Sequence, residues 1–177
     1  MAGLKKFIII LLAVLVLTGC SAANKTDEKK EEYETPVMMA RRQGKEIMEY
    51  VLNKDKEGLK SMFSKYILET HDLDNEIDEF FEFIDGEIIS YDEPDGDDRG
   101  GQYSPNESKR IRKLGGNVNN IKTDKGKTYS ISFLTYYIYN SNKDKVGVDV
   151  IGVIDEDSWE GEVPYKTVDK RGIGGSE

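Results

Sequence analysis

The stretch that decides the fold is Thr128–Asn140, TYSISFLTYYIYN, because its residues alternate in character along its length. An alternation of period two is typical of a β-strand with one face on the core. One face carries Tyr129, Ile131, Phe133, Thr135, Tyr137 and Tyr139. The other carries Ser130, Ser132, Leu134, Tyr136 and Ile138. We expect the first face to lie against helices, and the second, which begins with serines, to meet solvent.

A second strand is predicted after the polar loop Ser141–Asp144. Its apolar side also alternates and consists of Val146, Val148, Val150, Gly152 and Ile154. A four-residue loop sets Tyr137 opposite Val148 in the hairpin. It also sets Thr135 opposite Val150, so the apolar faces of the two strands agree.

Three helices are predicted before the strands, each from an apolar stripe at helical spacing. The stripes are Ala40, Gly44, Ile47, Met48 and Val51, then Leu59, Met62, Phe63, Tyr66 and Ile67, then Leu73, Ile77, Phe80, Phe81 and Ile84. Thr35 and Asp55 are capping residues ahead of the first two helices, and Pro36 suits the first helical position. Helices followed by antiparallel strands predict an α+β fold, with three N-terminal helices packed on a twisted antiparallel sheet.

The α+β domain is predicted to span residues 36–157. Two further strands are expected in it, Glu87–Tyr91 and an irregular one over 109–123 with a bulge near Gly115–Gly116. Residues 158–177 form a tail that we expect to be partly disordered, from Gly172 onward above all. The apolar residues of this tail, Trp159, Val163 and Tyr165, are placed to cover Leu134, Tyr136 and Ile138 on the outer face of the sheet.

Residues 51–64, VLNKDKEGLKSMFS, carry a resemblance to the nuclear transport factor 2-like (cystatin-like) superfamily. In that superfamily a first helix is followed by an Asp-capped helix with a Leu and Phe pair, which here are Asp55, Leu59 and Phe63. The resemblance implies a cone in which one sheet face lines a pocket under the helices. The superfamily includes isomerases, dehydratases, polyketide cyclases and non-catalytic modules, so the fold by itself selects no activity.

The N-terminus resembles that of small Gram-positive bacterial lipoproteins of unknown function that carry this domain. Lys5 and Lys6 precede an unbroken run of 11 apolar residues, and Leu17-Thr18-Gly19-Cys20 resembles a lipobox. The run is too short to span a bilayer, which needs about 20 residues. The resemblance implies a signal peptide over 1–19, removed by cleavage, and a palmitate-type lipid on Cys20. Residues 20–35 would be a flexible linker, and the protein would be anchored on the extracytoplasmic face of the cell membrane.

Charge excludes one class of partner. Residues 1–19 hold two of the 25 basic residues and no acidic one, so cleavage changes the formal charge from −9 to −11. Such a surface repels phosphate backbones, and we expect no nucleic-acid binding. The single cysteine is the lipidation site, so no disulfide is expected within the domain.

Catalytic and metal signatures are weak. The only histidine, His71, is predicted to lie exposed between two helices. The acidic loop within Asp92–Ser108 offers Asp92, Asp95, Asp97 and Asp98, yet both end positions of a calcium-loop pattern centred on Gly96 fail. We therefore expect no metal, no cofactor and no catalytic residue.

The remaining candidate is a small-ligand pocket on the apolar face of the two best strands. Its residues would be Tyr129, Ile131, Phe133, Thr135, Tyr137, Val148 and Val150. The favoured function is a non-catalytic, lipid-anchored domain that binds an envelope protein, a glycan or a small ligand. Two alternatives remain open at this point: a small-molecule enzyme of the isomerase, dehydratase or cyclase type, and a structural accessory of an envelope complex.

Overall fold

A computed structural model describes residues 34–102, 105–158 and 170–175 of the chain. The lipobox, Cys20, most of the linker and the tail residues Trp159, Val163 and Tyr165 lie outside these residues. The described chain is an α+β unit with four α-helices packed on a six-stranded antiparallel sheet. The helices are α2 (Pro36–Leu52), α3 (Lys56–Ser61), α4 (Lys65–Thr70) and α5 (Leu73–Phe83). The strands are β1 (Ile88–Ser90), β2 (Asp97–Gly100), β3 (Ile111–Thr123), β4 (Thr128–Tyr139), β5 (Gly147–Asp155) and β6 (Lys170–Gly174).

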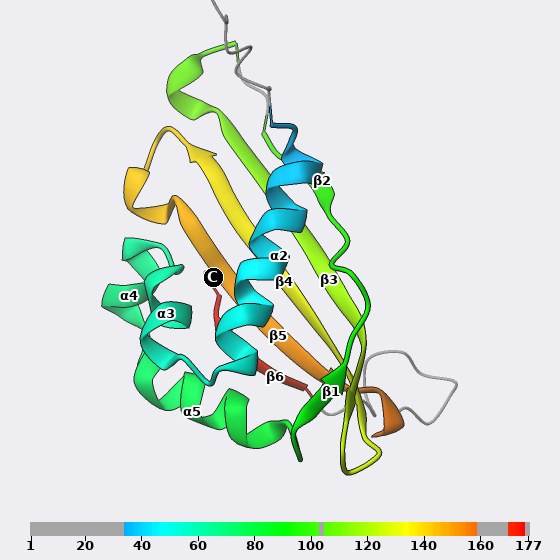
Figure 1. Cartoon of the computed structure of the whole chain (residues 1–177). Coiled ribbons are helices and arrows are strands. Elements are labelled where there is room, and N and C mark those ends of the chain that lie inside the picture. Colours follow the sequence, from blue (N-terminus) through cyan, green and yellow to red (C-terminus); the bar gives the residue numbers. More distant parts are fainter. Residues whose placement is uncertain (1–33, 103–104, 159–169, 176–177) are drawn as a thin grey trace, which may run out of the picture. The chain divides into compact units, whose positions relative to one another are not determined.

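The first helix forms as its sequence predicts. The Thr35 side chain accepts a hydrogen bond from the backbone N–H of Met38, and Pro36 occupies the first turn. The five stripe residues of this helix, from Ala40 to Val51, are all buried. Figure 1 shows α2 lying across the face of the sheet, with α3, α4 and α5 gathered beside it near β5 and β6.

The second predicted helix is wrong, because the chain breaks it into α3 and α4. Between them Phe63 forms a parallel bridge with Val148 of β5. The Ser64 N–H donates to the Val148 carbonyl at 2.9 Å, and the Val148 N–H donates to the Met62 carbonyl at 3.0 Å. Ser64 also caps α4 by accepting from the Ile67 N–H. A contact with a distant strand therefore ends one helix and starts the next.

The sheet is open, with strand order β1-β3-β4-β5-β6, and β2 pairs with β3 as well. The long β3 carries β2 along its first half and β1 at its end: Asp97 pairs with Gly115, and Ile88 pairs with Thr123. Part of the predicted loop Asp92–Ser108 is therefore the strand β2. The pairing of β3 with β4 shifts between Arg112 and Lys113, where Tyr137 of β4 is the extra residue, and between Val118 and Ile121, where the extra residue is in β3; the bulge predicted near Gly115–Gly116 is not at these two residues.

The predicted register of the β4–β5 hairpin is wrong, by two residues at Val148 and, beyond a bulge, by one residue at Val150. Phe133 pairs with Ile151 and Leu134 with Val150, but Thr135 pairs with Val148, so Asp149 is the extra residue. The bulge places Val148 in the core with an exposure of 0%. The side chain of Val150 points to the other face of the sheet, because it pairs with Leu134 and not with Thr135.

The predicted sides of Tyr136 and Tyr137 agree with the structure. Tyr137 packs against the core cluster, and its hydroxyl accepts from Arg112 Nε at 3.2 Å. Tyr136 lies outside that cluster and is nevertheless only 9% exposed. Lys113 lies 4.8 Å from its ring and the Tyr139 ring lies 5.2 Å away, so neighbouring strand residues help to cover Tyr136.

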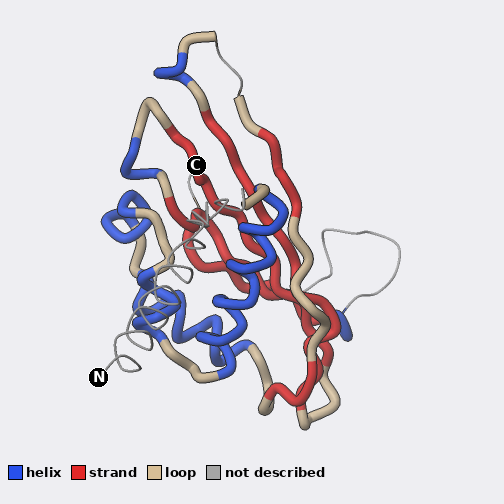
Figure 2. The backbone as a smooth tube through the Cα atoms, turned by 45° about the horizontal axis from the view of Figure 1, so that its top comes forward, coloured by secondary structure: helices blue, strands red, loops and turns tan. Residues whose placement is uncertain are grey.

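The tail contributes a strand, which corrects the prediction that the chain beyond Gly172 is disordered and that the domain ends at 157. β6 pairs with β5 through Ile151 and Ile173 among others, and Ile173 has an exposure of 0%. Figure 2 shows this strand as part of the sheet. Alternation is too short in β6 to give a sequence signal, since glycine occupies two of its five positions.

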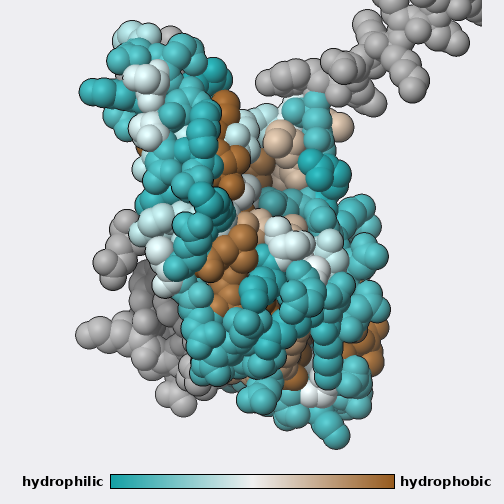
Figure 3. All heavy atoms as spheres, turned by 90° about the vertical axis from the view of Figure 1, so that its left-hand side faces the viewer, coloured by the Kyte–Doolittle hydropathy of each residue, from teal (hydrophilic) through white to brown (hydrophobic). Residues whose placement is uncertain are grey.

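The core cluster draws every member from residues 40–173, within the compact unit that begins at Glu34. The described part of the chain thus contains its own hydrophobic core. The side that carries α3 and α4 is mostly hydrophilic, and hydrophobic atoms gather in a hollow along its middle (Figure 3).

The two neighbouring phenylalanines of α5 should differ in their contribution to stability. Phe80 is fully buried, whereas Phe81 is half-buried and lies at a pocket, so the prediction that both are core residues holds only for Phe80. Phe80→Ala should lower the free energy of unfolding by about 3–5 kcal/mol, because it leaves a cavity. Phe81→Ala should cost less than half as much in urea unfolding. Equal losses would contradict this packing of α5.

Candidate functional site

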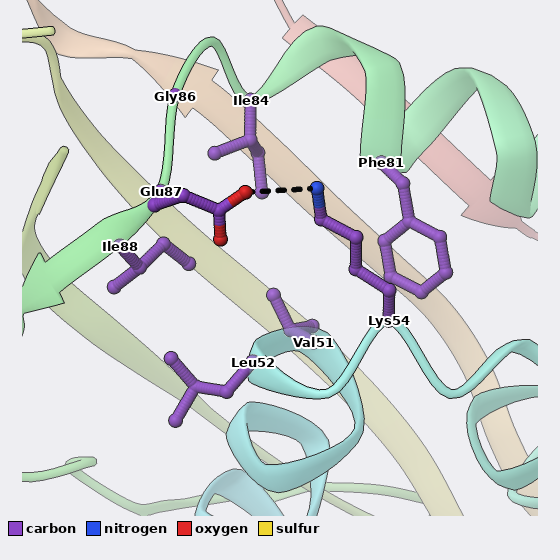
Figure 4. Close-up of a pocket in the computed structure, with 8 residues that line it drawn as sticks. All are labelled: Val51, Leu52, Lys54, Phe81, Ile84, Gly86, Glu87 and Ile88. Atoms are coloured by element: carbon purple, nitrogen blue, oxygen red, sulfur yellow. Dashed lines mark hydrogen bonds and ion pairs between the residues drawn. The ribbon is translucent and has the colours of Figure 1, made fainter. Parts of the chain in front are cut away.

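A small apolar pocket lies where the end of α2, the end of α5 and the start of β1 meet (Figure 4). Its volume is about 40 Å³, and it is lined by Val51, Leu52, Lys54, Phe81, Ile84, Gly86, Glu87 and Ile88. A space of this size accepts the tip of one apolar side chain and is too small for a drug-sized ligand, whose pockets are about 300–1,000 Å³. The geometry therefore suits a side chain presented by a larger partner.

Two turns build the pocket. After α2 the chain reverses at Lys54, which has a left-handed φ of 50°. After α5 it reverses at Gly86, whose φ is 97°. The Asp124 carboxylate lies beside Gly86 and accepts the backbone N–H of Glu87 at 2.9 Å, so the turn that leads into β1 is held against the β3–β4 turn.

One ion pair crosses the pocket. Lys54 Nζ lies 3.4 Å from Glu87 Oε1, and both side chains are well exposed, at 61% and 75%. An exposed pair of this kind contributes between about 0 and 1 kcal/mol. A partner can therefore displace it at little cost, and the two charges are then free to bind groups of opposite sign.

Apolar surface continues outward from the pocket through Leu52, which is 41% exposed, to Tyr91, which is 40% exposed. Leu52 and Tyr91 line a wider hollow next to α2, where Lys45 pairs with Glu93 at 2.9 Å. We call the pocket together with Leu52 and Tyr91 the α2–β1 surface. Exposed apolar groups that gather in this way mark interaction sites.

The sequence missed this surface because three of its residues, Val51, Phe81 and Ile84, belong to the helical stripes and were predicted to be core. Leu52 follows the last stripe residue of α2, and Ile84 and Ile88 flank a glycine. Apolar residues placed at helix ends and next to a turn are the only signal that could have indicated it.

The residues of the predicted ligand pocket on β4 and β5 lie together on the helix side of the sheet, except Val150. They fill the hydrophobic core and its margin and do not line an open pocket. Ile131 and Val148 have an exposure of 0%, Tyr129 of 2% and Phe133 of 4%. The Tyr129 hydroxyl accepts the Asp85 N–H at 3.0 Å. Thr135, 6% exposed, donates from its hydroxyl to Gln43 Oε1 of α2 at 2.7 Å, and Tyr137 packs at the margin. Val150 is on the opposite face.

Val150 belongs instead to a second hollow, of about 520 Å³, on the outer face of the sheet. It lies above a pair of glycines, since Gly152 pairs with Gly172, and Ser132 is the next residue across the sheet. The hollow forms because the two glycines have no side chains to fill it, and Leu134 and Ile154 lie at its sides. Among the described side chains that line it, Arg99 is the only charged one, and it lies 3.5 Å from Asp97.

The carboxylates of the acidic loop accept hydrogen bonds or form ion pairs within the fold. Asp95 accepts the backbone N–H of Asn117, Asp98 accepts Arg112 Nη2 at 2.8 Å, and Asp92 accepts the Asn120 amide. Asp97 pairs with Arg99. These carboxylates fasten the edge segment to β3, and within the described residues no group of three or more His, Cys, Asp or Glu is arranged to hold a metal ion.

His71 lies at the helix boundary that the sequence predicts, as the C-cap of α4, but it is not solvent-exposed as predicted, since its side chain is only 26% exposed. Its Nδ1 lies 3.0 Å from Glu76 Oε1, and its Nε2 lies 3.1 Å from the Gly175 carbonyl. Glu76 Oε2 accepts the Gly174 N–H at 2.7 Å. The two side chains hold the end of β6 against α4 and α5, which is a structural role.

Comparison with known families gives one match. A family model described as a domain of unknown function (DUF5104) matches residues 46–156, a range that includes the whole pocket and most of the sheet. A comparison with curated proteins found no match. In the described part of the chain, no helix is long and apolar enough to cross a membrane.

Removing the Glu76 carboxylate should loosen β6. Glu76→Ala leaves the Gly174 N–H and the His71 ring without this partner, and hydrogen bonds to a charged group are worth about 1.5–3 kcal/mol. Amide exchange at Ile173 and Gly174 should therefore become at least about tenfold faster. Glu79→Ala is the matched control on the same helix, since Glu79 is exposed and accepts a hydrogen bond from the Asn75 side chain of its own helix. Equal effects of the two substitutions would refute the role given to Glu76.

Proposed function

The chain belongs to the DUF5104 family, a family of unknown function, and we propose that it is a non-catalytic binding domain held on the extracytoplasmic face of the cell membrane by a lipid on Cys20. The proposal has two parts, an anchor and a binding surface. They rest on different observations and are tested separately.

The anchor is supported by the N-terminal sequence. A basic n-region, an apolar run and Leu17-Thr18-Gly19-Cys20 stand in the order that lipidation requires, and the chain has no second cysteine. Two acyl chains on one cysteine anchor a protein stably without a spanning helix. The linker between Cys20 and Glu34 would then have a reach on the order of 20 Å.

The binding role is carried by the α2–β1 surface. A pocket with five apolar lining residues opens beside the exposed side chains of Leu52 and Tyr91, and its one lysine and one carboxylate neutralise each other. Such a surface has the apolar centre and polar rim of a protein interface. It offers no nucleophile paired with a base, so it supports binding rather than chemistry.

The packing of the sheet face under the helices also favours an interaction role over a small-molecule enzyme. The residues that would line a catalytic cone there, Tyr129 and Phe133 among them, are 2% and 4% exposed. Asp149, the buried carboxylate of β5, is engaged by other groups and is no free acid or base. A domain of this kind acts through its surface.

The anchor predicts a simple labelling result. Cys20→Ala should leave the protein without lipid and with its N-terminal segment uncleaved, because both steps are expected to depend on the thiol. Metabolic labelling with a palmitate analogue, followed by intact mass, measures both. Labelling of the variant at the level of the natural protein would refute the anchor.

The binding surface predicts a site-dependent cross-link. A photoreactive amino acid at Leu52, expressed in the native cells, should give a discrete cross-linked species, and Ile88→Glu in the pocket should abolish it. Leu68 of α4 is the matched control, because it is as exposed as Leu52, at 41%. The same pattern from both positions, or none from Leu52, would refute the surface.

A further inference from the structure

The end of the sheet where the β2–β3 and β4–β5 connections meet is locally basic in an acidic protein. We call residues 97–113 and 140–146, without the undescribed 103–104, the basic end. Its cationic residues are Arg99, Lys109, Arg110, Arg112, Lys113, Lys143 and Lys145. Its anionic residues are Asp97, Asp98, Glu107 and Asp144. The two connections touch, since the Asn140 side chain donates to the Glu107 carbonyl and the Asn140 N–H donates to the Arg110 carbonyl.

The carboxylates of the basic end are already paired. Asp98 binds Arg112 at 2.8 Å, Asp97 lies 3.5 Å from Arg99, and Glu107 lies 3.8 Å from Arg110. Asp144 pairs with Lys65 of α4 at 3.3 Å. Among the described residues, no carboxylate lies within 4.0 Å of the ammonium groups of four lysines. They are Lys109, Lys113, Lys143 and Lys145, and their charge is left to act on something outside the domain.

Aromatic and apolar groups accompany these lysines. Lys113 lies over the Tyr136 ring at 4.8 Å, and Lys145 lies over the Tyr66 ring at 4.3 Å. Val146, between Lys145 and the first residue of β5, is 38% exposed. Lysines with tyrosines and an exposed aliphatic side chain are the composition that suits a lipid headgroup region, where one part of each side chain is apolar and the other wet.

The opposite end of the domain carries charges of both signs. The chain around the end of α5 and β1 holds Asp78, Glu82, Asp85 and Glu87, and the adjoining β3–β4 turn holds Lys122, Lys125 and Lys127. Charges separated by more than about 8 Å are screened at physiological ionic strength. The charges of that end therefore do not cancel the attraction that the basic end exerts on a nearby anionic surface.

The described chain starts at the basic end. The first turn of α2 packs on the start of β2, where a side chain on Gly96 would strike the Val37 carbonyl, and Glu34 folds back onto Arg42 at 2.9 Å. Figure 1 shows the start of α2 beside β2, at the end of the sheet toward which the β2–β3 and β4–β5 connections extend. A linker attached here leads to Cys20. We propose that the basic end rests on the anionic lipid headgroups of the membrane that holds the anchor, and that the α2–β1 surface is thereby turned away from the bilayer.

The orientation on the membrane rests on the proposed lipid anchor. The binding of the basic end to lipid headgroups can be measured with protein that lacks the anchor. Each lysine near an anionic bilayer strengthens binding by about fivefold. The chain from Ser21 to Glu177 contains the whole core cluster, so it is the protein to use. The probes are vesicles of phosphatidylcholine alone and of phosphatidylcholine mixed equally with phosphatidylglycerol.

The natural chain should sediment with the mixed vesicles and not with phosphatidylcholine alone, and added sodium chloride should release it. Lys109→Gln with Lys143→Gln should weaken the binding by about 25-fold, at about fivefold for each lysine. Lys122→Gln with Lys125→Gln is the matched control, because it removes two exposed charges at the β3–β4 turn, far from the basic end. Far-UV circular dichroism checks that each variant is folded.

Several outcomes would overturn the proposal: no binding to the mixed vesicles, equal binding to both vesicle types, or equal losses in the two double variants. So would release by inorganic phosphate beyond the effect of sodium chloride at the same ionic strength, which would indicate a site for the free anion. These outcomes are independent of the anchor and of the α2–β1 surface. Lipid labelling at Cys20 and cross-linking from Leu52 can succeed while the vesicle test fails, and the reverse.

Discussion

The structure depends on how closely α2 approaches the sheet, and glycine sets that distance. A Cβ on Gly44 would lie 2.7 Å from Pro94 Cβ and 3.3 Å from the Phe133 ring, and one on Gly116 would lie 3.1 Å from the same ring. Two missing side chains thus make room for one aromatic ring between helix and sheet. Because α2 is fixed along its length, its first turn lies beside β2 and its last turn lies beside β1.

A second close approach joins the shorter helices to the sheet. Gly147 has a φ of 134°, and a Cβ there would lie 2.8 Å from Ser64 N, so the backbone of the α3–α4 connection can bond directly to Val148. The bulge at Asp149 follows at once and decides which face Val148 and Val150 occupy. The bridge holds the start of β5 against the helices, and the bulge places the Val150 side chain on the outer face of the sheet, at the second hollow.

These constraints give the two ends of the domain different surfaces. The last turn of α2 meets α5 and β1 and forms the pocket, and the first turn meets β2 at the basic end. Under the two proposals, the basic end would face a membrane and the pocket would face a partner. Because α2 runs from the basic end to the pocket, the two proposed contacts lie at opposite ends of one rigid helix and can form at the same time.

The sequence by itself determined the features that depend on neighbours in the chain. Thr35 caps α2, the stripe from Ala40 to Val51 is buried, and Ile131 and Phe133 of β4 face the core, because helical and strand periodicities are local. Only the tertiary structure decided the break at Phe63, the bulge at Asp149 and the strand β6. Each of these exists through backbone hydrogen bonds to residues far along the chain, and such bonds leave no periodic pattern in a sequence. The pocket belongs to the second group, since it forms only where the ends of two helices and a strand meet.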